Sequence, residues 1–217
     1  MSLKTWTLFA LLASVPAIAS ASTARQTESI TPSTHYSASV PRDRQIQLAL
    51  SAAPPEVASK ATVYILGAKG YEKAREGSNG FSCIVERTFR GTVQTSVGPM
   101  CFDAEGSRTL LQVHFFTEEM RAQGKSEEQI KADIASGYKD GRFKAPGKPG
   151  ICYMLSSENY LYNPETKQSG PFPGHLMFYA PYMTAKDLGY AAVTGSMQPY
   201  LVEPGQPDAM LVVVPAP

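Results

Sequence analysis

His175 is the titratable side chain whose surroundings most favour chemistry, because it opens a strand-like apolar run at residues 175–180. Side chains alternate between the two faces of a strand, so His175 and Tyr179 share one face. Leu176 and Phe178 share the other. If that second face packs on helices, His175 and Tyr179 point away from them, into a pocket or into solvent. His175 is then either a ligand-binding or acid–base group, or a histidine bonded to nearby backbone.

Acid–base catalysis by His175 requires a carboxylate within hydrogen-bond reach, and the candidates are Glu86 and Asp103. Such an arrangement would make the protein a hydrolase-like enzyme. A nucleophilic Cys83 with His175 as its base is a further alternative, although no family motif surrounds this cysteine. The sequence contains no Walker loop, dinucleotide fingerprint or GxSxG elbow in a strand–turn–helix context. We therefore expect a non-enzymatic domain and keep the hydrolase-like enzyme as the alternative.

Tyrosines are dense between residues 153 and 200. A tyrosine presents a large apolar face and a polar tip, which suits the binding of glycans or peptides. We expect Tyr153, Tyr179 and His175 to form the binding surface for a small ligand or for a partner that is a component of the cell envelope. Packing of the same tyrosines in the core and at sheet edges is the alternative that the sequence leaves open.

Two of the three cysteines lie in strand-like segments 18 residues apart, at Cys83 and Cys101. Cysteines on neighbouring extended segments tend to pair in an oxidising compartment. The third, Cys152, lies inside an apolar run, where a free thiol behaves as a small hydrophobic side chain. The sequence therefore predicts a disulfide between Cys83 and Cys101, and it leaves the redox state of Cys152 open.

No metal site and no cofactor are expected. His114 and His175 with Asp103 or Glu105 would supply enough donors for zinc, but nothing in their spacing brings them together. The chain carries 20 Lys and Arg against 19 Asp and Glu. This balance argues against a nucleic-acid partner, which requires a positive field. The ligand and the oligomeric state remain open.

Residues 1–21 have the three parts of a secretory signal peptide. Lys4 supplies a positive charge, residues 6–15 form a short apolar core, and small residues follow at the cleavage site. We expect cleavage after Ala19 or Ala21, and a secreted or periplasmic location. No later run is long and apolar enough to span a membrane. Residues 22–44 are rich in Ser and Thr without an apolar period, and they are predicted to be a flexible arm.

The remaining chain, residues 45–217, is predicted to be a single α+β domain. Its antiparallel or mixed sheet packs against two consecutive helices, and 17 Gly and 17 Pro indicate many loops. Residues 111–115 alternate between apolar and polar, which favours an extended run. Ser126 with Gln129 predicts a capping box at the start of a helix. The predicted strands, marked by β-branched and aromatic runs, are residues 62–66, 81–87, 151–155, 175–180 and 210–214.

Four blocks of sequence, NGFSC, CFDAEG, PGICYML and GHLMFYAP, occur in this order. Together they resemble a group of secreted bacterial proteins in which similar blocks recur, over about residues 46–214. The resemblance implies export and a single domain. The group has no established activity, so the resemblance implies no catalytic residue.

Overall fold

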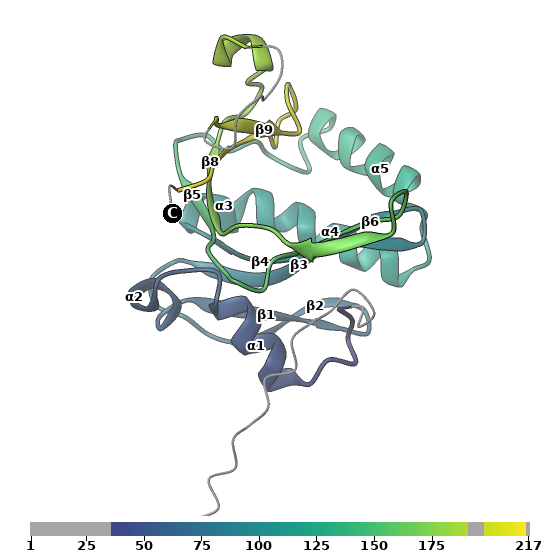
Figure 1. The fold of residues 1–217 in the computed structure, drawn as a ribbon, viewed down its shortest axis with the longest axis vertical. Helices are drawn as coiled ribbons and strands as arrows, with labels where there is room; N and C mark the ends of the chain where they lie inside the picture. The colour runs from purple at the N-terminus through teal and green to yellow at the C-terminus, as the bar shows by residue number, and fades with distance from the viewer. Residues whose placement is uncertain (1–35, 191–197, 216–217) are drawn as a thin grey trace, which may run out of the picture.

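The computed structural model describes residues 36–190 and 198–215. Within them, one sheet of ten strands runs through the molecule in the order β2-β1-β3-β4-β5-β8-β10-β9, and the β6–β7 hairpin joins it at β4 (Figure 1). All neighbouring strands are antiparallel except β1 and β3. The strands are β1 Thr62–Gly67, β2 Gly70–Arg75, β3 Ser82–Arg90, β4 Val93–Phe102, β5 Ile151–Met154, β6 Tyr160–Asn163, β7 Gln168–Pro171, β8 His175–Tyr179, β9 Tyr200–Val202 and β10 Met210–Val213. The mixed sheet with its helices confirms the predicted α+β class.

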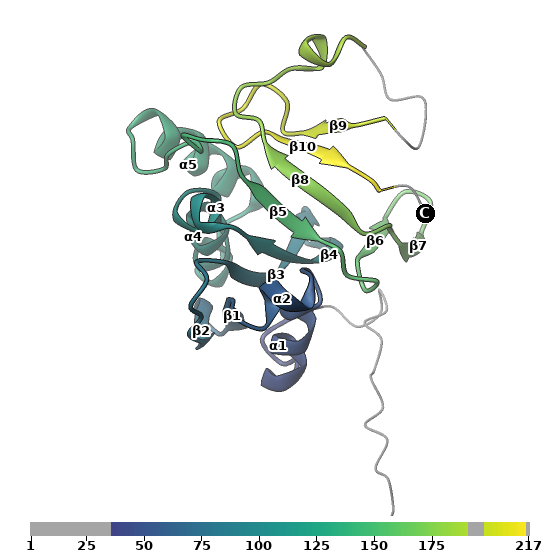
Figure 2. The same ribbon diagram turned by 90° about the vertical axis from the view of Figure 1, so that its left-hand side faces the viewer.

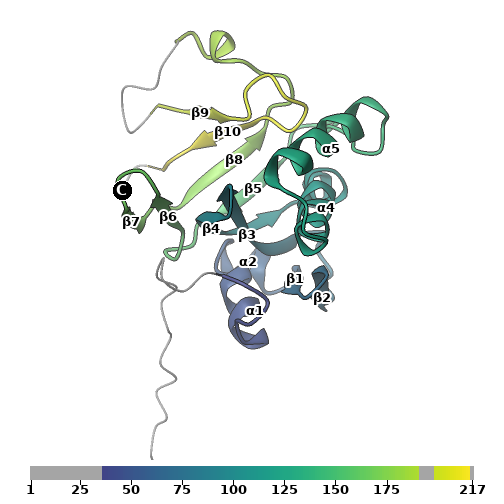
Figure 3. The ribbon, with the colours of Figure 1, turned by 90° about the vertical axis from the view of Figure 1, so that its right-hand side faces the viewer.

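The helices lie on two sides of the sheet (Figures 2 and 3). On one side, α1 and α2 cover a core that includes Leu48, Val63 and Val85. On the other side, α4 covers a second core with Leu111 and Met177. The helices are α1 Arg42–Leu50, α2 Pro55–Ala58, α3 Ala104–Arg108, α4 Leu110–Ala122 and α5 Glu127–Lys139, and a 3-10 turn spans Ala185–Leu188.

Strand β3 feeds both cores because its side chains alternate between the two faces. Cys83 and Val85 belong to the α1 side, and Ile84 belongs to the α4 side. Antiparallel pairing with β4 places Cys83 directly opposite Cys101, and the two are joined by a disulfide. The predicted pairing is therefore confirmed, and Cys152 is a buried free cysteine.

The ordered domain begins before residue 45, so the predicted flexible arm at residues 22–44 is wrong in its last part. Tyr36 is fully buried, and its hydroxyl donates to Gln45 Oε1 over 2.6 Å. The parallel pairing of β1 with β3 extends over only two residue pairs. Beyond these two pairs, β3 no longer pairs with β1. There the side chain of Gln45 binds both the N–H and the carbonyl of Leu66 in β1. The predicted signal peptide and His35 lie outside the described residues.

Residues 111–115 form part of helix α4 and not the extended run that their alternation predicts. The alternation misleads because one face of α4 mixes apolar Leu110 and Val113 with polar His114 and Thr117, so its apolar residues do not form a single helical stripe. The predicted capping box is confirmed: Ser126 accepts from the Gln129 N–H, and the Gln129 side chain accepts from the Ser126 N–H. The C-terminal apolar strand β10 lies between β8 and β9 and is an interior strand. None of the helices in the described ranges has the length and apolar character needed to cross a membrane.

Candidate functional site

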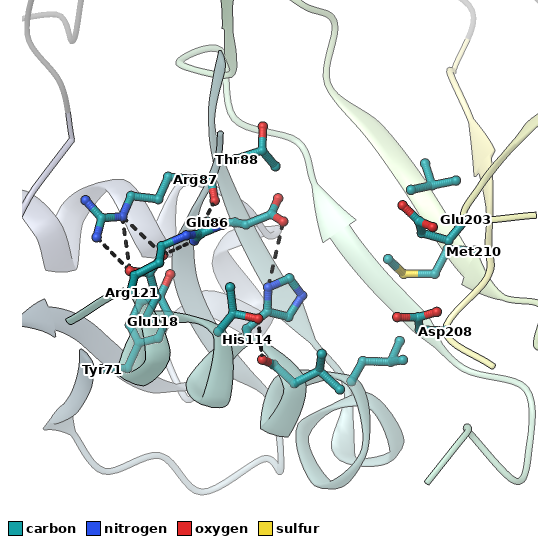
Figure 4. Close-up of a pocket in the computed structure, with 14 residues that line it drawn as sticks. Tyr71, Glu86, Arg87, Thr88, His114, Glu118, Arg121, Glu203, Asp208 and Met210 are labelled. Atoms are coloured by element: carbon teal, nitrogen blue, oxygen red, sulfur yellow. Dashed lines mark hydrogen bonds and ion pairs between the residues drawn. The ribbon is translucent and has the colours of Figure 1, made fainter. Parts of the chain in front are cut away.

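A pocket of about 230 Å³ lies between strand β3, helix α4 and the turn that joins β9 to β10. Helix α4 supplies one wall through residues that recur at helical spacing and therefore share one face. These six residues are Leu110, Val113, His114, Thr117, Glu118 and Arg121. Strand β3 adds Glu86 and Thr88, and the opposite wall carries Glu203, Asp208 and Met210 (Figure 4). Three segments far apart in sequence thus converge on one cavity.

His114 lies in the middle of this pocket, next to Glu86. Its Nδ1 is 3.8 Å from Glu86 Oε1, which is ion-pair distance if the imidazole is protonated but longer than a hydrogen bond (Figure 4). One side of the His114 ring packs near the Phe102 ring, with centroids 5.4 Å apart. A strand fixes the carboxylate and a helix fixes the imidazole, so both groups stand on rigid elements.

Two further carboxylates, Glu203 and Asp208, face His114 from the other side of the pocket (Figure 4). Burial is the main reason that the pKa of Asp208 is raised above its ordinary value, and the charge of Glu203 raises it further. His114 acts in the opposite direction and lowers it. Glu203 has a φ of 50°, a left-handed backbone conformation that favours glycine. A charged residue is thus kept at a strained turn position on the rim of the pocket.

The raised pKa of Asp208 predicts that Asp208→Asn stabilises the protein at neutral pH. The folded state binds this proton more tightly than the unfolded state, so the parent loses stability as pH rises from about 3.8 through the folded pKa. Asparagine cannot ionise, so the variant does not lose this stability. The free energies of unfolding of the parent and the variant should converge below the ordinary aspartate pKa. Urea unfolding at several pH values measures the effect.

Asp187 is the matched control for this prediction. It is exposed, and hydrogen bonds from Thr184 lower its pKa. The lowered pKa of Asp187 makes its charged form stabilise the folded protein. This stabilisation is present above the ordinary pKa and is lost as pH falls. Asp187→Asn should therefore not stabilise the protein at neutral pH. If the free energy of unfolding depends on pH in the same way for the parent and for Asp208→Asn, the raised pKa of Asp208 is contradicted.

A buried ionic network closes one end of the pocket. Glu118, whose side chain is 3% exposed, accepts hydrogen bonds from the guanidinium groups of Arg87 and Arg121. Arg121 also binds both oxygens of Glu127, at 2.7 and 2.8 Å. The ring of Phe89 lies beside both guanidinium groups, 5.2 and 4.8 Å from its centroid. Both arginines that line the pocket are therefore neutralised by carboxylates of the protein itself.

His175, Tyr179 and Tyr153 do not share one surface. Strand pairing sets Met154 opposite His175, and Tyr153 opposite Leu176. His175 and Tyr179 consequently face the α4 side, where they are 5% and 8% exposed. Tyr153 faces the α1 side and packs on Phe81. The expected arrangement is not found: Met177 and Tyr179, on the same face as His175, pack in the core that contains Leu111 of α4, whereas Leu176 and Phe178 point to the opposite face.

The environment of His175 is local backbone and an aromatic ring. Its Nδ1 lies 3.0 Å from the carbonyl oxygen of Pro173, and its ring packs near Phe172. Among the described residues, no carboxylate lies within ion-pair distance of it. Neither predicted partner joins it: Glu86 lies beside His114, and Asp103 caps helix α3 by accepting from the Gly106 N–H.

Asp103 and Tyr179 instead form a structural cluster. Asp103 accepts from the Ile151 N–H, and the Tyr179 hydroxyl lies 2.9 Å from both Asp103 Oδ1 and the Ile151 carbonyl oxygen. Burial raises the pKa of Tyr179, so its hydroxyl stays protonated as a donor. These contacts tie β8 to β5 and to the start of α3.

Sequence reasoning missed His114 as a pocket residue, and also Glu203 and Asp208. A detectable signal was present, because the polar residues His114, Thr117 and Arg121 recur at helical spacing. No group of three or more His, Cys, Asp or Glu side chains in residues 36–190 and 198–215 is arranged to hold a metal ion.

Comparison of the chain with models of protein families, with curated proteins and with solved structures finds no match. The geometry of the pocket is consequently the main evidence on function.

Proposed function

We propose that this is an exported domain that binds a small ligand in the pocket around His114. One observation carries the proposal: an imidazole and three carboxylates, from a strand, a helix and a turn, converge on one cavity. Partly buried titratable groups that meet in a cleft are typical of functional sites. Export is supported by the signal-peptide pattern of residues 1–21 and by the disulfide, because disulfides persist in oxidising compartments.

The size of the pocket limits the ligand. A cavity of about 230 Å³ is smaller than the roughly 300–1,000 Å³ that is typical for drug-sized ligands. The ligand is therefore a small molecule or one end of a larger one.

The chain contains three histidines, which makes histidine-selective NMR a direct test. With ¹⁵N-labelled histidine, we expect at least one class in a panel of small amines, alcohols, sugars and carboxylates to shift the ring signals of His114. His175 serves as the internal control because it is buried outside the pocket. A His114→Gln variant assigns the signal. If no compound in the panel moves the His114 signal at millimolar concentration, the proposal fails.

A hydrolase-like enzyme is the second candidate, with His114 and Glu86 in the places that the sequence argument gave to His175 and its partner. The favouring observation is their separation of 3.8 Å inside a cavity, since catalytic contacts often shorten when substrate binds. The threonine hydroxyls of the pocket are already engaged, that of Thr117 with the Val113 carbonyl and that of Thr88 with Ser96. The nucleophile would therefore be water. Ester hydrolysis that His114→Gln and Glu86→Gln both abolish would favour this candidate over simple binding.

A further inference from the structure

We infer that the pocket recognises a small organic cation, an alkylammonium group, through the carboxylates of Glu86, Glu203 and Asp208. This inference rests on the proposed function, since it names the ligand class of the same pocket. The carboxylates come from two walls, with Glu86 on β3 and the other two beside the β9–β10 turn, and His114 stands between them (Figure 4).

The pocket has an excess of negative charge. Its lining contains four carboxylates, counting Glu118, and two guanidinium groups, those of Arg87 and Arg121. Both guanidinium groups bind Glu118, and Arg121 binds Glu127 as well. Within the described ranges, no lysine or arginine forms an ion pair with Glu86, Glu203 or Asp208. His114 is the basic group that lies 3.8 Å from Glu86 and lowers the pKa of Asp208. Residues 191–197, just before β9 in the chain, contain no basic side chain.

Uncompensated carboxylates in a partly buried cavity are costly, because burial penalises the charged form. Asp208 shows this penalty in its raised pKa, to which Glu203 contributes. An ammonium group between these carboxylates would remove the penalty and lower the same pKa. An anionic ligand would increase the penalty, and a neutral ligand would not remove it because it supplies no positive charge.

Apolar side chains complete the lining. Met210 and Leu110 are almost fully buried, and Val202 and Val113 lie nearer the surface of the pocket. Such walls suit a short alkyl chain, because burying methylene groups is favourable. The combination of an acidic rim, apolar walls and small volume fits an alkylamine better than an inorganic cation, which would require a cluster of ligating oxygens.

The test compares ligands of one shape and different charge. Titrations monitor His114 by NMR and heat by calorimetry, with n-butylammonium, 1,4-diaminobutane, n-butanol and butyrate as probes at low ionic strength. We expect the two amines to bind and the alcohol and butyrate to bind at least tenfold more weakly. Asp208 loses a proton when the cation binds. At a pH near its raised pKa, the amount of proton released should therefore increase with the amount of amine bound.

Variants test the residues. Glu86→Gln and Asp208→Asn should each weaken amine binding about tenfold, the effect of losing one favourable charge contact of about 1.4 kcal/mol. Asp187→Asn, outside the pocket, should leave it unchanged. Unfolding curves of each variant separate lost binding from lost folding, and Asp208→Asn is expected to fold well.

The outcomes separate the inference from the proposed function. If butyrate or butanol shifts His114 as strongly as the amines do, the pocket is a binding site but the cation assignment is wrong. If no butyl probe shifts His114 but another class of the wider panel does, the cation assignment is wrong and the proposed function stands. If no compound of the wider panel shifts His114 either, the proposed function itself fails. An alkylammonium group exists both in free amines and in lysine side chains, so Nα-acetyl-lysine methylamide and a lysine-containing hexapeptide form a second arm. If the peptide binds at least as strongly as 1,4-diaminobutane, the natural ligand is a lysine side chain. If the peptide binds more weakly than 1,4-diaminobutane, the natural ligand is a free amine.

Discussion

We expect Glu118→Gln to lower the free energy of unfolding by about 3–5 kcal/mol, the usual result of removing one partner from a buried ion pair. Glutamine has nearly the volume of glutamate, so the change removes charge and leaves packing almost intact. Glu118 is 3% exposed and neutralises Arg87, whose side chain is 17% exposed. Arg121 keeps Glu127 in the variant, whereas Arg87 keeps no carboxylate among the described residues. Neutral acceptors, such as the Tyr36 carbonyl and the new amide oxygen, and the face of Phe89 remain beside it.

The large effect also follows from the position of Glu118 in the fold. Arg87 extends from β3, Glu118 lies on α4, and the Tyr36 carbonyl belongs to the segment before α1. One carboxylate thus links the sheet, a helix and the N-terminal segment, near the place where β1 separates from β3. Loss of its charge leaves a nearly buried guanidinium without a carboxylate.

Glu119→Gln is the matched control, because Glu119 is the next residue of α4 and is exposed. We expect it to change stability by less than about 0.5 kcal/mol, as surface substitutions generally do. Replacing both Arg87 and Glu118 by methionine should recover much of the loss, since no unpaired charge remains. Urea unfolding measures both variants. If Glu118→Gln lowers the free energy of unfolding no more than Glu119→Gln does, the ionic network does not stabilise the fold.

About half of the sheet is predictable from sequence, because β1, β3, β5, β8 and β10 contain β-branched, aromatic or other apolar runs close to Gly or Pro. Strand β10 is an example: Met210–Val213 is continuously apolar and lies between two other strands. Strand β4 was missed in its first part because residues 93–98 are mixed in polarity, and their pairing with the end of β3 is what makes them a strand. Helix α4 was missed in its first turns because its pocket face mixes Leu110 and Val113 with His114 and Thr117, so no single apolar stripe is visible.

The pocket around His114 was not found from the sequence because a strand pattern shows which side chains share a face but not which face packs in the core. His175 and Tyr179 do share a face, as the alternation predicts. The sequence does not show that the face of Met177 and Tyr179 packs with Leu111 of α4. The pocket around His114 is formed by β3, α4 and the β9–β10 turn, and contacts between segments about a hundred residues apart are not visible in local patterns. Glu86, one of the sequence candidates, does lie in the pocket, but with His114 as its neighbour.

The disulfide carries the second large expected effect. We expect Cys83→Ala/Cys101→Ala to lose about 3 kcal/mol of unfolding free energy, because a bridge that closes a loop of this size reduces the entropy of the unfolded chain by that amount in the chain-entropy model. Both cysteines are fully buried in the core on the α1 side, so alanine leaves no unpaired polar atom there. The bridge joins β3 to β4 close to Glu86, and it should therefore stabilise the strand that carries one carboxylate of the pocket.

Cys152→Ala separates the effect of the bridge from the effect of losing a buried sulfur. Cys152 is equally buried, in the core on the α4 side, but forms no bridge. If the bridge is the main contributor, adding reductant should destabilise the parent and Cys152→Ala by the same amount and leave the double variant unchanged in urea unfolding. Thiol titration of the denatured parent without reductant should find one free thiol per chain. Three free thiols, or a parent that is insensitive to reductant, would mean that packing at these two positions, and not the cross-link, stabilises the centre of the sheet.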